Sequence, residues 1–212
     1  MIEDLKAIFG PKCTAIAINK DLPEMVNIPS NSMKLCEAVN YSFCTPLKIV
    51  HENLGCPGAR RSTGFDNDDS ALARTISANS QIPLRFTTDA LQEIPKLEGV
   101  NFVVLGISEN METVIQPDLY IIYVQPYMVT NLMHVLAKNE IKPAISPFSL
   151  LSICGNVFAN CYKNKVVTLS FGCPESRKHG GVEKSEVVVG IPFKYARFLV
   201  DSQLKNFIKS NR

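Results

Sequence analysis

The sequence predicts an α+β protein built from two similar halves that a pseudo-twofold axis relates around a shared core. Residues 44–64 and 161–181 align without a gap and are identical at 8 of 21 positions. Unrelated segments would share roughly one or two positions at background amino-acid frequencies, so we interpret the match as an internal duplication. Apolar periodicities of strands and helices alternate along the chain. The 212 residues, 46% of them hydrophobic, suffice for one sizeable core.

The elements of the first half follow from periodicity and from turn residues. Residues 1–10 have the pattern of a short amphipathic helix that ends at Gly10-Pro11. Alternating small and β-branched residues predict a strand at 14–19. The other expected elements are a helix at 30–44 with Ser30 or Ser32 as N-cap, a strand at 47–54, and helices at 68–80 and 87–97, the latter capped by Thr87 or Thr88.

The second half repeats this order with one extra helix. Apolar runs predict strands at 101–108 and 119–125, and one apolar face predicts a helix at 127–139. A helix at 149–162, strands at 165–171 and 186–193, and an amphipathic helix at 195–210 complete it. We place the boundary near Gly99, so that 1–99 and 100–212 form the halves of one compact domain. The apolar run 119–129 suits either the core or the edge of a homo-oligomer.

Each copy of the repeat carries the pattern Gly-Cys-Pro-x-x-Arg, centred on Cys56 and Cys173. The glycine permits unusual backbone angles and the proline makes the turn rigid. A thiol on such a turn at a strand end is presented into space. If the prolines open short helices, Arg60 and Arg177 lie one turn away, where they would favour the thiolate and bind an anionic ligand.

Four cysteines occupy matched places in the repeat, namely Cys44, Cys56, Cys161 and Cys173. Four thiolates, two from each half, suit an iron–sulfur cluster, with zinc as the alternative. We prefer the iron–sulfur cluster because structural zinc usually takes closely spaced ligand pairs and no CxxC occurs.

The other cysteines are more typical of structural positions. Cys36 and Cys154 precede the matched helix-end cysteines by eight and seven residues, a spacing that fits core packing as readily as ligation. Cys13 has no counterpart in the other half. Asp66, Asp68 and Asp69 lack the spacing of a calcium loop, and we expect them to cap a helix.

Composition limits the partners. With 22 basic and 20 acidic residues, the chain has no electrostatic footprint for nucleic acid. No apolar run approaches the roughly 18 residues that span a bilayer, and the N-terminus does not have the pattern of a secretory signal. We therefore expect a cytoplasmic protein with neither nucleic acid nor membrane as partner, in which the seven cysteines are reduced.

The motifs around the cysteines resemble the ArCR family, domain of unknown function 169. The resemblance rests on Leu-Cys-Glu-Ala-Val at 35–39, Gly-Cys-Pro-Gly-Ala at 55–59, Val-Gln-Pro-Tyr-Met at 124–128, Cys154, Cys173 followed by Arg177, and Gly-Ile-Pro at 190–192. The chain departs from the expected pattern in having Glu175 in place of a glycine, and in carrying Cys44 and Cys161. The resemblance implies an origin in anaerobic archaea or bacteria, which suits oxygen-sensitive thiolate chemistry, and it names no reaction.

Three functions stay open on this evidence. The first is a metal or iron–sulfur protein of redox or cofactor metabolism. The second is an enzyme that uses Cys56 and Cys173 as opposed thiols to exchange protons on a small anionic substrate, as in two-base isomerisation. The third is a binding or assembly module whose cysteines are structural. The sequence does not decide whether the protein is an enzyme.

Overall fold

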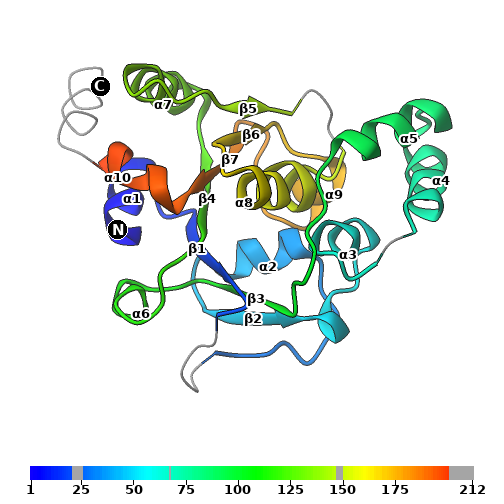
Figure 1. Ribbon diagram of the computed structural model, residues 1–212, viewed down its shortest axis with the longest axis horizontal. Helices are drawn as coiled ribbons and strands as arrows, with labels where there is room; N and C mark the ends of the chain where they lie inside the picture. The colour runs from blue at the N-terminus through cyan, green and yellow to red at the C-terminus, as the bar shows by residue number, and fades with distance from the viewer. Residues whose placement is uncertain (21–25, 67, 147–149, 201–212) are drawn as a thin grey trace.

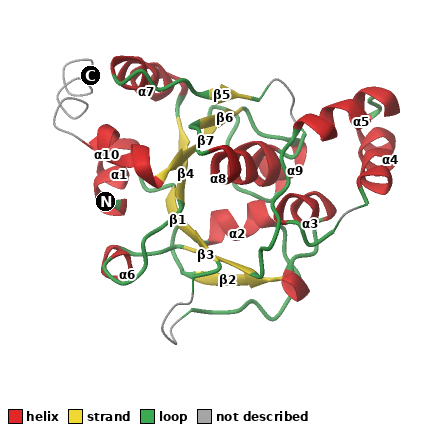
Figure 2. Cartoon of the chain, viewed as in Figure 1, coloured by secondary structure: helices red, strands yellow, loops and turns green. Residues whose placement is uncertain are grey.

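A mixed sheet forms the centre of the protein, and helices cover both of its faces (Figures 1 and 2). The computed structural model describes residues 1–20, 26–66, 68–146 and 150–200. Within these ranges the sheet has seven strands in the order β2-β3-β1-β4-β7-β6-β5. All neighbours are antiparallel except β5 and β6, which are parallel. The strands are β1 (Cys13–Ile18), β2 (Leu47–Val50), β3 (Phe102–Leu105), β4 (Leu119–Val124), β5 (Ala144–Ile145), β6 (Thr168–Ser170) and β7 (Val187–Pro192).

The two central strands, β1 and β4, are buried along their whole length. They pair with each other from Cys13 opposite Ile122 to Ile16 opposite Leu119. Both strands are continuous apolar or small-residue runs because helices cover both faces of the sheet. Alternate residues therefore enter two separate cores: Ala15 belongs to one and Ile16 to the other.

Three helices pack on one face of the sheet: α1 (Ile2–Phe9), α7 (Pro126–Lys138) and α10 (Phe193–Val200). On this face the core includes Leu5, Tyr120 and Leu132, each fully buried. The Tyr120 hydroxyl donates to Glu112 in the short helix α6 (Glu109–Glu112), which satisfies the only polar atom of that side chain.

The opposite face carries the cysteine-bearing helices. These are α2 (Leu35–Tyr41), α3 (Pro57–Thr63), the π-helix η2 (Ser152–Ala159) with its continuation α8 (Asn160–Asn164), and α9 (Pro174–Lys178). Figure 1 shows α2, α3 and α8 together on this side of the sheet. A π-helix of this length is rare, and such segments occur frequently at functional sites.

A peripheral helix pair, α4 (Asp69–Ser80) and α5 (Leu84–Glu93), lies beyond α3 at the right of Figure 1. Asp68 caps α4 by accepting a bond from Ala71 N at 2.8 Å, which confirms that this acidic segment caps a helix. Buried Arg61 of α3 binds Asp69 and the carbonyls of Leu91 and Ile94, and so fixes the pair to the domain.

The sequence-based elements agree with the structure except at several boundaries. The helix expected at 30–44 spans only Leu35–Tyr41, and Lys34 occupies the N-cap position in place of Ser30 or Ser32. Before it, Asn27 and Met33 form bridges to Leu47 of β2 and to Leu54. The helix expected at 87–97 begins at Leu84 and ends at Glu93. Residue 149 and the end of the closing helix, 201–210, lie outside the described residues. Within the apolar run 119–129, residues 119–124 form the central strand β4 and therefore belong to the core.

Three elements of the described residues were missed: the short helix α6, the two-residue strand β5, and the 3-10 helix η1 (His51–Asn53), which replaces the end of the strand expected at 47–54. All three are too short to produce a periodic signal. None of the helices within the described ranges has both the length and the apolar character to cross a membrane.

We expect Phe158→Ala to lower the free energy of unfolding by about 3–5 kcal/mol, because the ring is fully buried between η2 and the sheet and its loss leaves a cavity. Phe171→Ala is the matched control, since this ring is 62% exposed, and should change stability by less than about 0.5 kcal/mol. Urea denaturation followed by circular dichroism measures both values. Equal losses would contradict the core as described.

Candidate functional site

The two cysteine turns have the same local construction. Cys56 is the N-cap of α3 and Cys173 the N-cap of α9, and a proline occupies the first position of each helix. Proline suits that position because its missing N–H would have no helical partner there. At the second turn Ser176 N donates to the Cys173 sulfur at 3.4 Å, while Cys173 N donates to the Ser176 hydroxyl at 2.8 Å. The expectation that both prolines open short helices is confirmed.

Arg60 and Arg177 hold the two turns in the same way. The Arg60 guanidinium donates to the carbonyl of Leu54, two residues before Cys56. The Arg177 guanidinium donates to the carbonyl of Phe171, two residues before Cys173. Further donors go to the carbonyls of His51 and Glu183, respectively. Each arginine therefore clamps the strand end to the helix that follows it. An additional role in anion binding stays a prediction.

Two more cysteines approach these turns from neighbouring helices. Cys36, on α2, is buried, and its thiol donates to the carbonyl of Glu175 in the first turn of α9 at 3.9 Å. Cys154, in the π-helix, forms a side-chain hydrogen bond with Ser62 of α3. The sulfur of Cys154 is 3.9 Å from the position that a Cβ on Gly58 would take. The Cys36 thiol thus contacts the first turn of α9, and the Cys154 thiol lies against the first turn of α3.

The electrostatics join the four thiols into one cluster. Burial, with the charges of Cys173 and Cys56 adding to it, raises the pKa of Cys36 to about 12. Burial likewise raises the pKa of Cys154 well above its ordinary value, with added repulsion from Cys56, Cys173 and Cys36. Because contacts and charge interactions both link them, we call Cys36, Cys56, Cys154 and Cys173 the four-thiol cluster.

Glycines allow the helices of the cluster to approach closely. A Cβ on Gly58 would lie 2.3 Å from Leu151 Cδ2, at the contact between α3 and η2. A Cβ on Gly180, after α9, would lie 2.9 Å from the Cys36 Cβ. At Gly58 the end of the Leu151 side chain would have to turn away. At Gly180 a Cβ would also lie 2.7 Å from the Ser176 carbonyl oxygen, so a side chain there would displace α2 or the end of α9.

An ion pair between the halves borders the cluster. Lys34, which caps α2, binds the carboxylate of Glu175, and His179 Nε2 lies 3.7 Å from the same carboxylate. The hydrogen bond to Glu175 raises the pKa of Lys34, and the charges of Cys56 and Cys36 raise it as well. Lys34 is therefore a cation within electrostatic reach of two of the thiols, although Glu175 already engages it.

Tyr123 is a further neighbour of the thiols. Its hydroxyl donates to the carbonyl of Gly180 at 2.9 Å. Burial raises the pKa of Tyr123, as do the charges of Cys36, Glu186 and Cys173. The ring stands edge-on to Phe43, with centroids 4.9 Å apart. Tyr123 thus connects the central strand β4 with the segment that follows α9.

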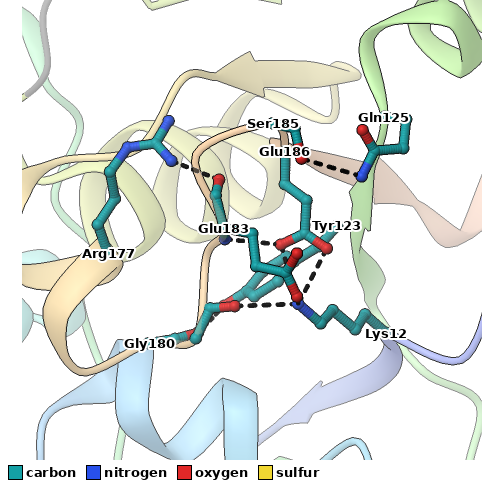
Figure 3. A network of polar contacts seen from close by, with 9 residues as sticks. Lys12, Tyr123, Gln125, Arg177, Gly180, Glu183, Ser185 and Glu186 are labelled. Carbon is teal, nitrogen blue, oxygen red and sulfur yellow. Dashed lines mark hydrogen bonds and ion pairs between the residues drawn. The ribbon is translucent and has the colours of Figure 1, made fainter.

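Figure 3 shows how that segment is held. Lys12, before β1, binds Glu183 at 2.8 Å, Glu186 at 2.9 Å and the carbonyl of Gly181 at 3.2 Å. Glu186 is 7% exposed and also accepts a bond from Glu183 N. On the outer side, an open hollow of about 760 Å³ is lined by Arg177 and residues 181–185. Lys12 thereby fixes the second cysteine turn to the start of the sheet.

The set predicted from the sequence is only half assembled. Cys56 and Cys173 belong to the cluster, but Cys44 is exposed. Cys161 is fully buried, and the groups that act on its thiol are Lys165 and Thr168, none of them a cysteine. The other two members of the cluster are Cys36 and Cys154. Their spacing on the helices fits either core packing or ligation. All seven cysteines are free thiols.

The geometry does not form a ready metal centre. Across residues 1–20, 26–66, 68–146 and 150–200, no group of three or more His, Cys, Asp or Glu side chains is arranged to hold a metal ion. The metal or iron–sulfur site with Cys44, Cys56, Cys161 and Cys173 as ligands stays a prediction, in which Cys44 is exposed and Cys161 is fully buried.

A family model described as uncharacterised ArCR matches residues 5–202. The chain belongs to the ArCR family. The match includes all four thiols of the cluster and confirms the resemblance seen in the cysteine motifs. No curated protein and no solved structure gave a significant match.

We expect Cys36 to react with iodoacetamide at pH 8 at least about 100-fold more slowly than a thiol of ordinary pKa, because only a minute fraction is ionised below a pKa of about 12. Exposed Cys44 is the internal control and should react first. The Cys36 rate should keep rising with pH towards 12. Peptide mapping after timed alkylation measures it. Equal rates for Cys36 and Cys44 would contradict the buried position of Cys36.

Arg177→Lys should destabilise the protein by about 1 kcal/mol, because a lysine cannot bind the Phe171 and Glu183 carbonyls together. Lys178→Ala, at an exposed neighbouring position, is the control and should change stability by less than about 0.5 kcal/mol. Urea midpoints measure both. An Arg177→Lys variant as stable as the parent would show that the clamp contributes nothing.

Proposed function

We propose that the four-thiol cluster is the functional centre and binds a thiophilic metal ion or an iron–sulfur cluster, in redox or cofactor metabolism. In this proposal the ligands are Cys36, Cys56, Cys154 and Cys173, and the protein is cytoplasmic, with a small ligand or cluster as its partner. The observation that carries the proposal is the contact of the Cys36 sulfur with the first turn of α9 and of the Cys154 sulfur with α3, the two helices that Cys173 and Cys56 cap.

The repulsion itself favours a cation. Burial raises the pKa of Cys36 and that of Cys154, and repulsion from the neighbouring thiols adds to the effect of burial. A bound metal ion reverses this effect, because a coordinated thiol loses its proton outright. Lys34 is a cation near two of the thiols, and Glu175 already neutralises it. The cluster therefore has more potential negative charge than the neighbouring cation can compensate.

Binding requires the side chains to turn. No three of the sulfurs are arranged to hold a metal as they stand. Rotation about the Cα–Cβ bond moves a sulfur without moving its helix, and the helices already approach closely at Gly58 and Gly180. Iron–sulfur clusters and zinc both accept four thiolates, and the chain carries four at this place.

The order of the strands supports an ancestral duplication. From the central β1–β4 pair outward, the sheet reads β3 then β2 on one side and β7 then β6 on the other. Along the chain, α2 with Cys36 precedes β2, and α3, capped by Cys56, follows it. Likewise η2 with Cys154 precedes β6, and α9, capped by Cys173, follows it. In this proposal a pseudo-twofold axis passes between β1 and β4, and β3 belongs to the first half. The dividing line then falls after Leu105, later than Gly99.

A second candidate function rests on the exposure of the two turn cysteines. Cys56 and Cys173 are both partly exposed, as two acid–base groups acting on a substrate must be. They would serve as opposed thiols on a small anionic substrate. The two arginines favour this function less, because each already donates to two backbone carbonyls.

The decisive experiment is metal and sulfide analysis with an absorbance spectrum, on protein purified without oxygen and then reconstituted with ferrous iron and sulfide, or with zinc. We expect stoichiometric metal, lost in Cys56→Ser and Cys173→Ser. Cys44→Ser is the matched control and should retain the metal. Circular dichroism identifies any variant that has lost its fold.

Metal-free protein after both reconstitutions would contradict the proposal. The two-thiol enzyme would then be the next hypothesis, tested by proton–deuterium exchange into small carboxylates in D₂O. If Cys56→Ser and Cys173→Ser changed neither ligand content nor thermal stability, the cysteines would be structural.

A further inference from the structure

The four thiols divide into two crossed pairs with the same geometry. The Cys36 sulfur reaches the carbonyl of Glu175, two residues after Cys173. The Cys154 sulfur lies 3.9 Å from the Cβ position of Gly58, two residues after Cys56. Each helix thiol therefore meets the first turn of the cysteine-capped helix from the other half of the sequence. The pairs are Cys36 with Cys173 and Cys154 with Cys56.

We propose that each crossed pair is a dithiol that exchanges with small-molecule disulfides, so that the oxidised protein contains the disulfides Cys36–Cys173 and Cys56–Cys154. A turn thiolate attacks one sulfur of the small disulfide, forms a mixed disulfide and releases the first small thiolate, which takes up a proton. The helix thiol then attacks the mixed disulfide, and the second small thiol leaves with its proton. Two protein thiols are oxidised and one small disulfide is reduced to two thiols.

In the pair Cys36–Cys173 the two thiols differ in exposure. Cys173 is partly exposed at the end of a rigid turn, where a small disulfide reaches it, and Cys36 is buried against the first turn of α9. In the pair Cys56–Cys154 both thiols are partly exposed, Cys56 at the end of a rigid turn and Cys154 against α3 through its bond with Ser62. In each pair the turn thiol begins the exchange and the helix thiol completes it.

The remaining cysteines lack such a partner thiol. The groups that act on Cys13 are Lys6, Glu112 and Glu3, and those that act on Cys161 are Lys165 and Thr168. Cys44 is exposed, so it can take up a small thiol but is not expected to resolve it. The exchange uses the same thiols as the proposed metal centre, although it does not depend on metal binding. A bound metal would block it.

The test starts from reduced, metal-free protein incubated with oxidised glutathione, followed by acid quenching, alkylation and peptide mapping without reduction. We expect linked peptides that join Cys36 to Cys173 and Cys56 to Cys154. Links between Cys36 and Cys56, or between Cys154 and Cys173, would overturn the pairing. Protein with only glutathione adducts and no internal link would overturn the exchange itself.

Single substitutions separate the two steps. Cys154→Ser should leave Cys56 trapped as its glutathione adduct, while the Cys36–Cys173 link still forms. Cys56→Ser should abolish the link to Cys154 and leave the other pair intact. Cys44→Ser is the control and should keep both links. Loss of both links in Cys56→Ser with a native circular dichroism spectrum would contradict two independent pairs. The exchange is tested on metal-free protein, so its failure would leave the metal proposal unaffected. If the protein bound no metal on reconstitution but formed both disulfides, only the exchange would be retained.

Discussion

The close approach of four helices on one face of the sheet is the constraint on which the rest of the site depends. At Gly180 there is no room for a methyl group beside Cys36 and the Ser176 carbonyl, and at Gly58 a methyl group would displace the Leu151 side chain. A packed core cannot absorb even one added carbon without moving its neighbours. Gly180 thereby sets how closely α2 and the end of α9 approach.

The sheet supplies the frame that makes this packing reproducible. Because β1 and β4 are buried along their length, the helices on either face have a fixed apolar surface to pack on. Lys12 extends this frame to the second cysteine turn through Glu183 and Glu186. The two arginine clamps fix the turns locally, and the Lys12 contacts fix one of them relative to the sheet.

Sequence patterns predict what is local, and they fail where tertiary contacts decide. The two cysteine turns, their prolines and most strands follow from local sequence. The start of the helix after Lys34 does not, because Met33 forms a bridge to Leu54 in place of helical bonds. Likewise, matching the repeats favoured Cys44 and Cys161. Their exposure and burial depend on packing, which an alignment of two segments does not contain. The spacing of Cys36 and Cys154 on their helices was the usable signal.

The members of the four-thiol cluster are far apart along the chain, and 139 residues separate Cys36 from its contact at Glu175. A bond between Cys36 and Cys173 or between Cys56 and Cys154 would close a loop of roughly 100 to 140 residues, which removes on the order of 4–5 kcal/mol of configurational entropy from the unfolded chain in the simplest model. A disulfide or a bound metal at the cluster would therefore also stabilise the folded chain. The free energy of unfolding then reports whether the thiols are bonded or free.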